Sequence, residues 1–98
     1  MQITLICSAG MSTSMLVARM DEAAKKKGID VVISAHSWTN LEKVIKQTDI
    51  LLIGPQLSYA EEDLRAQYPD MPMAVIDSIK YGTMNGDAVL EDALALQK

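Results

Sequence analysis

The sequence predicts an α/β domain built on a four-stranded parallel sheet, with helices covering both faces of the sheet. Short apolar runs typical of strands alternate four times with segments of helical periodicity. One run, residues 50–53, is apolar without alternation, as in a strand covered on both sides. A repeated strand–helix order implies parallel strands joined by right-handed crossovers, because a parallel neighbour is reached only through a crossover connection.

In the first half of the chain, residues 3–6 are apolar and predict the first strand, and a helix follows from about residue 12. This helix is expected to end at Gly28, after the basic run 25–27, and a second strand is expected at residues 30–35. Four apolar residues at helical spacing predict the buried face of this first helix: Leu16, Met20, Ala23 and Ala24. A hydroxyl at Thr39 three residues before Glu42 has the spacing of a capping box, which predicts that a short helix begins there.

The second half is predicted to contain two further strands, each followed by a helix. The strands are residues 50–53 and 73–76, and the helices are residues 61–67 and 86–96. Pro69 limits the first of these helices, because proline and the residue before it disfavour helical geometry. The last strand and the last helix are expected to be joined by a loop through Tyr81 and Gly82. The whole chain, residues 1–98, is therefore interpreted as a single domain.

Composition excludes several classes of function. The formal net charge is −4 and no basic stripe is present, so we expect no nucleic-acid partner, because phosphate neutralisation supplies most of that affinity. No apolar run approaches the roughly 20 residues that a membrane helix needs, and the N-terminus does not resemble a signal peptide. Cys7 is the single cysteine and cannot form an internal disulfide. We expect a cytoplasmic protein without a metal or a cofactor.

The first strand ends at Cys7, on a loop that can hold an anion. The loop residues are Ser8, Ala9, Gly10, Met11, Ser12, Thr13 and Ser14. Small residues and a glycine let successive N–H groups point into one concavity, and the first helix opens there with its unpaired N–H groups. Amides that stabilise a phosphate also stabilise the thiolate that attacks it. The pattern therefore predicts a phosphate cradle with a nucleophilic Cys7 at its rim.

Three segments carry a resemblance to a known family: residues 5–14 (LICSAGMSTS), 51–59 (LLIGPQLSY) and 75–82 (VIDSIKYG). In this order they resemble the cysteine loop, the third strand with its following loop, and the fourth strand with its exit loop of the lactose/cellobiose-type IIB proteins of the bacterial sugar phosphotransferase system. The resemblance covers essentially the whole chain. It implies a four-stranded parallel sheet similar to that of the low-molecular-weight tyrosine phosphatases.

The resemblance also implies a relay. A phosphohistidine of a IIA protein would donate its phosphoryl group to Cys7, with residues 8–14 as the cradle. The phosphocysteine would then donate to a sugar bound in the membrane subunit IIC, which places the protein transiently at the inner face of the membrane. The family relation suggests a β-glucoside or a β-linked disaccharide. Partner-contact candidates at the same edge are Gly54, Pro55, Gln56 and Tyr81.

Other residues at this edge have more ordinary interpretations. We expect Asp77 to cap a turn, Tyr59 to pack near a helix start, and His36 to be a loop residue without catalytic function. For Tyr81, contact with a partner and packing under the exit loop with a solvated hydroxyl both remain open. His36 and Trp38 depart from the family pattern, which leaves the identity of the partner and of the sugar open.

The main alternative is a relative of the low-molecular-weight tyrosine phosphatases and arsenate reductases. Those enzymes need an arginine six residues after the cysteine to bind the phosphoryl oxygens, and Thr13 stands at that position here. Arg19 lies too far along the helix to substitute for it. A redox thiol protein is a second alternative, and with no other cysteine in the chain its disulfide chemistry would have to be intermolecular. A binding module is a third, and it gives no reason for a thiol at the anion site.

Overall fold

The computed structural model describes residues 1–8 and 10–96. Its strands form one parallel sheet in the order β2-β1-β3-β4. The strands are β1 (Gln2–Cys7), β2 (Val32–Ser37), β3 (Ile50–Ile53) and β4 (Met73–Val75). This arrangement confirms the predicted four-stranded parallel sheet.

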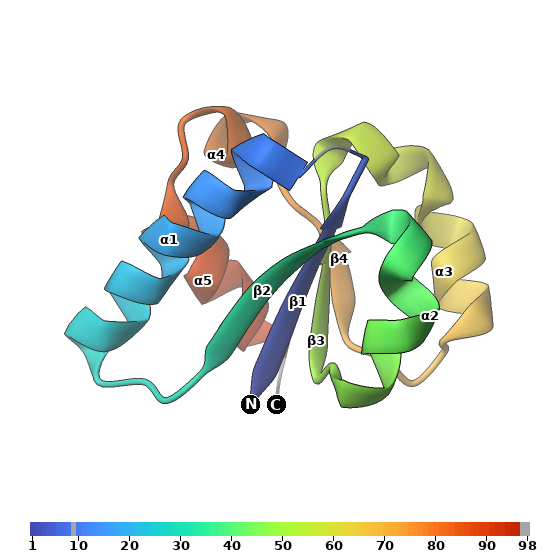
Figure 1. Ribbon diagram of the computed structural model, residues 1–98, viewed down its shortest axis with the longest axis horizontal. Coiled ribbons are helices and arrows are strands. Elements are labelled where there is room, and N and C mark those ends of the chain that lie inside the picture. The colour runs from blue at the N-terminus through green and yellow to red at the C-terminus, as the bar shows by residue number, and fades with distance from the viewer. Residues whose placement is uncertain (9, 97–98) are drawn as a thin grey trace.

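Helices cover both faces of the sheet, with α1 and α5 on one side and α2 and α3 on the other (Figure 1). The α-helices are α1 (Gly10–Lys27), α2 (Leu41–Val44), α3 (Glu61–Gln67), α4 (Ser78–Gly82) and α5 (Gly86–Ala95). Three 3-10 turns complete the connections: η1 (Trp38–Asn40), η2 (Ile45–Gln47) and η3 (Pro55–Ala60). Over the described part of the chain, no helix combines the length and the apolar character that crossing a membrane requires.

Each face of the sheet has its own apolar core. Leu52 belongs to the core under α1 and α5, whereas its neighbours Leu51 and Ile53 belong to the core under α2 and α3. Successive side chains of a strand point to opposite faces, so β3 contributes to both cores. The four residues predicted for the buried face of α1 are all buried: Leu16, Met20, Ala23 and Ala24.

Several element boundaries differ from prediction. The helix α1 begins at Gly10 rather than near residue 12, and β2 lies two residues later than expected, so His36 is a strand residue and not a loop residue. The prediction that Thr39 and Glu42 form a capping box is also wrong. Asn40 precedes α2 and makes no side-chain capping bond, because Thr39 belongs to η1, where its N–H donates to Ser37 Oγ at 3.4 Å.

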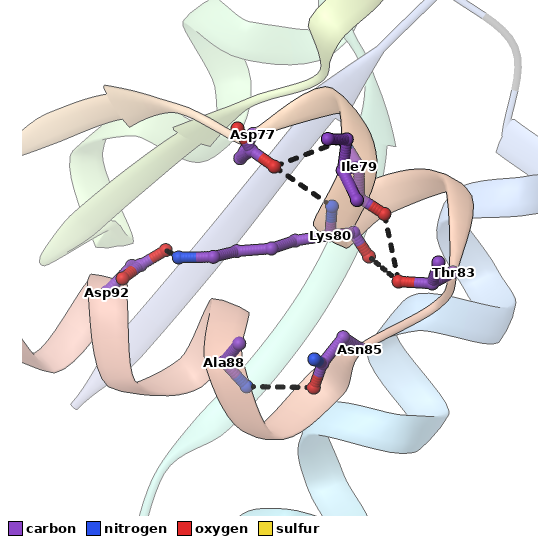
Figure 2. Close-up of polar contacts among 7 residues, drawn as sticks. All are labelled: Asp77, Ile79, Lys80, Thr83, Asn85, Ala88 and Asp92. Carbon is purple, nitrogen blue, oxygen red and sulfur yellow. Dashed lines mark hydrogen bonds and ion pairs between the residues drawn. The ribbon is translucent and has the colours of Figure 1, made fainter.

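The segment around Tyr81 was expected to be a loop but forms the short helix α4. Asp77 begins it, with one carboxylate oxygen accepting from the N–H groups of Ile79 and Lys80 at 3.1 Å each (Figure 2). This confirms Asp77 as a capping residue. The Lys80 ammonium lies 2.7 Å from the Asp92 carboxylate and so joins α4 to α5 on the surface. That hydrogen bond raises the pKa of Lys80, and partial burial opposes the increase.

Candidate active site

Cys7 is the last residue of β1, at the edge of the sheet where the strands end. It is 1% exposed and lies in register with Ser37 at the end of β2. On its other side the chain leaving β3 turns at Gly54, whose N–H donates to the carbonyl of Ile6 at 2.8 Å. The two neighbouring strands therefore place Cys7 between a serine and a glycine.

Gly54 approaches Cys7 closely because it has no side chain. A Cβ atom at this position would lie 3.4 Å from Cys7 Cβ and 3.1 Å from the backbone oxygen of Ile6. It would also lie 2.9 Å from the side-chain oxygen of Gln56. The position thus favours glycine for steric reasons.

The first turn of α1 begins at Gly10, three residues after Cys7. This helix has 18 residues and no acidic residue in its first turn, so the positive end of its dipole is not offset by a carboxylate there. Such a terminus favours an anion. Ser8 and Ser14 are exposed. Ala9 and the side chains of Met11 and Ser12 lie outside the described residues, so the cradle formed by residues 8–14 stays a prediction.

Thr13 makes a contact that sequence reasoning missed. Its side chain is fully buried (0% exposed), and its hydroxyl oxygen lies 3.1 Å from the hydroxyl oxygen of Tyr81. This hydrogen bond ties the first turns of α1 to α4. The residues are separated by 68 positions, so no local pattern could have revealed the pair.

Tyr81 is 8% exposed and its ring packs in the core under α1 and α5. Of the two possibilities left open for Tyr81, packing describes its ring, but the hydroxyl is not solvated as that possibility supposed, because it bonds to Thr13 in the interior. Among the other partner-contact candidates, Gln56 is exposed, Pro55 is half-buried and Gly54 is buried. Gln56 therefore offers the most surface of the four, and partner contact by these residues stays a prediction.

Two exposed aromatic residues follow β2 and β3, the strands on either side of β1. Tyr59 was expected to pack near a helix start, but it is 76% exposed in η3. Trp38 is 50% exposed in η1. The ring of His36 lies 3.2 Å from Ser34 Oγ, measured from Nε2, on the same strand. Within residues 1–8 and 10–96, no three His, Cys, Asp or Glu side chains gather as a metal site.

The arrangement places a thiol close to a helix N-terminus, which favours both a thiolate and a bound anion. Cys7 is held at a strand end, three residues before a helix begins, and the backbone N–H groups of a helix N-terminus can stabilise developing negative charge. The position six residues later, where a phosphatase needs a cation, is occupied by the buried Thr13 bonded to Tyr81. The described site thus has a cysteine at the strand end but not the arginine of a phosphatase.

Comparison with known proteins gives a consistent result. Residues 2–92 match the family model described as "PTS system, Lactose/Cellobiose specific IIB subunit". The galactose-specific EIIB component of Lactococcus lactis subsp. cremoris and the cellobiose-specific EIIB component of Lactococcus lactis subsp. lactis are each 40% identical to the chain, covering 93% of it and 91% of the relative. The oligo-beta-mannoside-specific EIIB component of Bacillus subtilis is 37% identical, covering 97% of this chain and 94% of the relative.

Solved structures agree with this assignment. The solution structure of the cellobiose-specific IIB component from Borrelia burgdorferi is 41% identical and superposes with a TM-score of 0.82, covering 98% of this chain and 90% of that one. The lactose-specific IIB domain from Streptococcus pneumoniae, at 14% identity and a TM-score of 0.83, shares the fold, covering 100% of this chain and 98% of its own. This fold is that of the low-molecular-weight tyrosine phosphatases. IIB components are phosphotransferases that transfer phosphate to sugar. The chain therefore belongs to the lactose/cellobiose-specific IIB family of the sugar phosphotransferase system.

Proposed function

We propose that the protein is a phosphocarrier that receives a phosphoryl group on Cys7 from a IIA protein and passes it to a sugar bound in a membrane IIC subunit. The observation that carries this proposal is the position of the only cysteine, at the end of β1 and three residues before the first residue of α1. This position matches the demand of the chemistry, because a thiolate nucleophile and a phosphoryl group both gain from unpaired N–H donors.

In the first half-reaction, the Cys7 thiolate attacks the phosphorus of a phosphohistidine on IIA. The sulfur–phosphorus bond forms as the nitrogen–phosphorus bond breaks, and the electron pair stays on the imidazole, which takes up a proton. Residues 8–14 stabilise the charge on the equatorial oxygens through backbone N–H and hydroxyl groups. Positioning and electrostatics supply most of the rate enhancement in phosphoryl transfer.

In the second half-reaction, a sugar hydroxyl attacks the phosphorus of the phosphocysteine. The oxygen–phosphorus bond forms as the sulfur–phosphorus bond breaks, the thiolate is regenerated, and the hydroxyl proton leaves to a base of the membrane subunit. A relay gains from slow hydrolysis, because water would release the phosphoryl group without moving a sugar. The buried Thr13 at the phosphatase arginine position supports a relay over a phosphatase.

The sugar proposed is a β-glucoside or a β-linked disaccharide. The relatives that carry this choice are a cellobiose-specific and an oligo-beta-mannoside-specific component, whereas a third is galactose-specific. Selection of the sugar lies with the membrane subunit, which binds it. The carrier would act in the cytoplasm and dock transiently at the inner face of the membrane, where the membrane subunit binds the sugar.

The test is the intact mass of the protein after incubation with phosphoenolpyruvate, the general phosphotransfer proteins and a candidate IIA. Wild type is expected to gain one phosphoryl group, and to lose it when vesicles with the membrane subunit and the sugar are added. Cys7→Ser is expected to gain none, because an alkoxide is inaccessible at neutral pH while the side-chain volume is similar. Circular dichroism of this variant serves as the control for folding.

Two results would contradict the proposal. The first is labelling of Cys7→Ser at the rate of wild type, which would move the acceptor to another residue. The second is turnover of an aryl phosphate by the protein alone together with no adduct from any IIA, which would favour the phosphatase alternative.

A further inference from the structure

The helices α2 and α3 cover the face of the sheet opposite α1 and α5 (Figure 1). A series of three hollows is lined by residues on this side of the molecule. It begins in a hollow of about 250 Å³ whose lining includes Ile6, Trp38, Leu57 and Tyr59. A second hollow of about 350 Å³ shares Trp38 with the first. A third, of about 360 Å³, follows it, and the second and third meet at Tyr68. We call these three hollows the α2–α3 groove.

Two exposed aromatic residues line the first hollow of the groove. Trp38 is 50% exposed and Tyr59 is 76% exposed, and they belong to η1 and η3, which follow different strands. Exposed aromatic rings beside an apolar hollow are typical of interface residues that carry much of a binding energy. Neither ring takes part in the proposed chemistry at Cys7.

The charged residues that line the groove all have the same sign. Within the described part of the chain they are Glu42, Asp63 and Asp70. Arg65 of α3 does not line the groove, and its guanidinium binds the Glu61 carboxylate at 2.7 Å. An apolar floor with an acidic rim is complementary to an apolar segment flanked by basic residues.

The first hollow reaches the end of β1, where Ile6 is one of its lining residues. Ile6, which lines the first hollow, directly precedes Cys7. In the proposed relay two partners must approach Cys7 in turn, so both cover the same edge. The groove extends from the end of β1 toward Tyr68, away from Cys7. It therefore offers a binding surface that one of the two partners can use while the other contacts only the surroundings of Cys7.

We propose that the α2–α3 groove receives an apolar segment flanked by Lys or Arg on the cytoplasmic side of the membrane subunit, and this inference rests on the proposed relay. Cytoplasmic loops of membrane proteins carry an excess of Lys and Arg. The acidic rim matches that composition. The groove thereby gives the carrier a contact with the sugar-binding subunit that the phosphoryl donor does not use.

The experiment measures the two half-reactions separately, for Trp38→Ala and Asp63→Lys. Labelling by IIA is followed by intact mass, and transfer to sugar is followed in inverted vesicles that carry a membrane subunit active with wild type. We expect labelling within about twofold of wild type and transfer at low carrier concentration reduced about tenfold or more, as for a truncated interface aromatic. Asp63→Lys should also weaken the dependence of transfer on salt, because a rim charge acts mainly through steering.

Matched controls lie at the opposite end of the sheet. Val32→Ala removes an exposed apolar side chain from the start of β2, and Asp30→Lys reverses an exposed charge just before it. Both are expected to transfer as wild type does. Melting temperatures of all four variants show that folding is kept.

A second measurement keeps the inference separate from the relay chemistry. Co-sedimentation of the unphosphorylated protein with vesicles that contain the membrane subunit, against empty vesicles, reports docking alone. Weaker co-sedimentation of Trp38→Ala and Asp63→Lys than of the two controls supports the groove even where no label reaches Cys7. Unchanged docking and transfer in both groove variants would overturn the inference, as would an equal loss in the IIA half-reaction, which would assign the groove to the donor. Failure of wild type to label, with docking intact, would count against the relay only.

Discussion

At the scale of single residues, the surroundings of Cys7 are set by side chains that are small or absent. Gly54 can lie against Cys7 because it has no side chain. A Cβ atom at this position would lie 3.1 Å from the Ile6 carbonyl oxygen. Thr13 fills a fully buried position beside Tyr81. A charged side chain there would lose its hydration, which costs free energy. These contacts fix the end of β1 and the start of α1, between which the proposed phosphoryl group would sit.

Gly54→Ala is expected to lower the free energy of unfolding by about 1–2 kcal/mol, as in other overpacked sites, and to slow labelling of Cys7. The added methyl group meets backbone at Ile6, so the end of β3 must move away from the cysteine. Urea denaturation and the time course of labelling measure the two effects. Gly82→Ala is the matched control, because its Cβ would meet nothing within 4 Å. Wild-type labelling and stability in Gly54→Ala would contradict the steric argument.

Tyr81→Phe and Thr13→Val each remove one hydroxyl of the buried pair. Each is expected to lower the free energy of unfolding by about 1 kcal/mol, because the remaining hydroxyl loses its buried partner. The double variant is expected to lose less than the sum of the two, since both changes remove the same hydrogen bond. Urea denaturation of the four proteins in the cycle gives the coupling. Strict additivity would show that the two hydroxyl groups do not interact.

At the scale of secondary-structure elements, the helices are held in place by tight backbone contacts as well as by apolar faces. Gly86 opens α5 where that helix meets α1, and Asn85 precedes it, its side chain accepting from the N–H of Ala88 (Figure 2). A Cβ at Gly86 would lie 2.5 Å from the carbonyl carbon of Arg19 and 2.6 Å from the nitrogen of Met20. The backbones of the two helices are therefore in direct contact at this point.

Gly86→Ala is expected to destabilise the protein more than Gly54→Ala does, by about 3 kcal/mol. The clash is with backbone atoms of α1, so α5 must shift as a unit away from the core. Thermal and urea denaturation measure the loss, again with Gly82→Ala for comparison. A change below about 0.5 kcal/mol, the ordinary range of surface substitutions, would disprove the close approach of the two helices.

At the scale of the whole molecule, one sheet separates two apolar cores and couples them. Leu51 and Leu52 are adjacent in β3 but belong to different cores, and both are buried. Loss of packing on either face removes support from the same strand. The two cores are thus expected to unfold together.

Leu51→Ala and Leu52→Ala are each expected to lower the free energy of unfolding by about 3 kcal/mol, the middle of the range for buried leucines. The single tryptophan, Trp38, reports the face covered by α2 and α3, whereas far-ultraviolet circular dichroism reports all helices. Leu52 belongs to the core under α1 and α5, on the face opposite Trp38. Leu52→Ala should nevertheless lower the urea midpoints of the tryptophan fluorescence and of the circular dichroism by the same amount. Two separate midpoints would show that the cores unfold independently.

Much of this architecture is determined by the sequence alone. The unalternated run of residues 50–53 predicted a strand buried on both faces, and all four residues are buried there. The buried face of α1, the capping role of Asp77 and the place of Cys7 at the end of the first strand also followed from local pattern. Periodicity works for these features because side-chain direction repeats along a helix or a strand.

Tertiary structure alone decided the contacts between distant segments. The short helix α4 was missed because five residues show too little periodicity, and the Thr13–Tyr81 bond joins residues 68 positions apart. The exposure of Trp38 and Tyr59 likewise depends on how η1 and η3 flank the α2–α3 groove. The physical reason is the same in each case. Local spacing fixes which way a side chain points within its own element, whereas packing between elements fixes what that side chain meets.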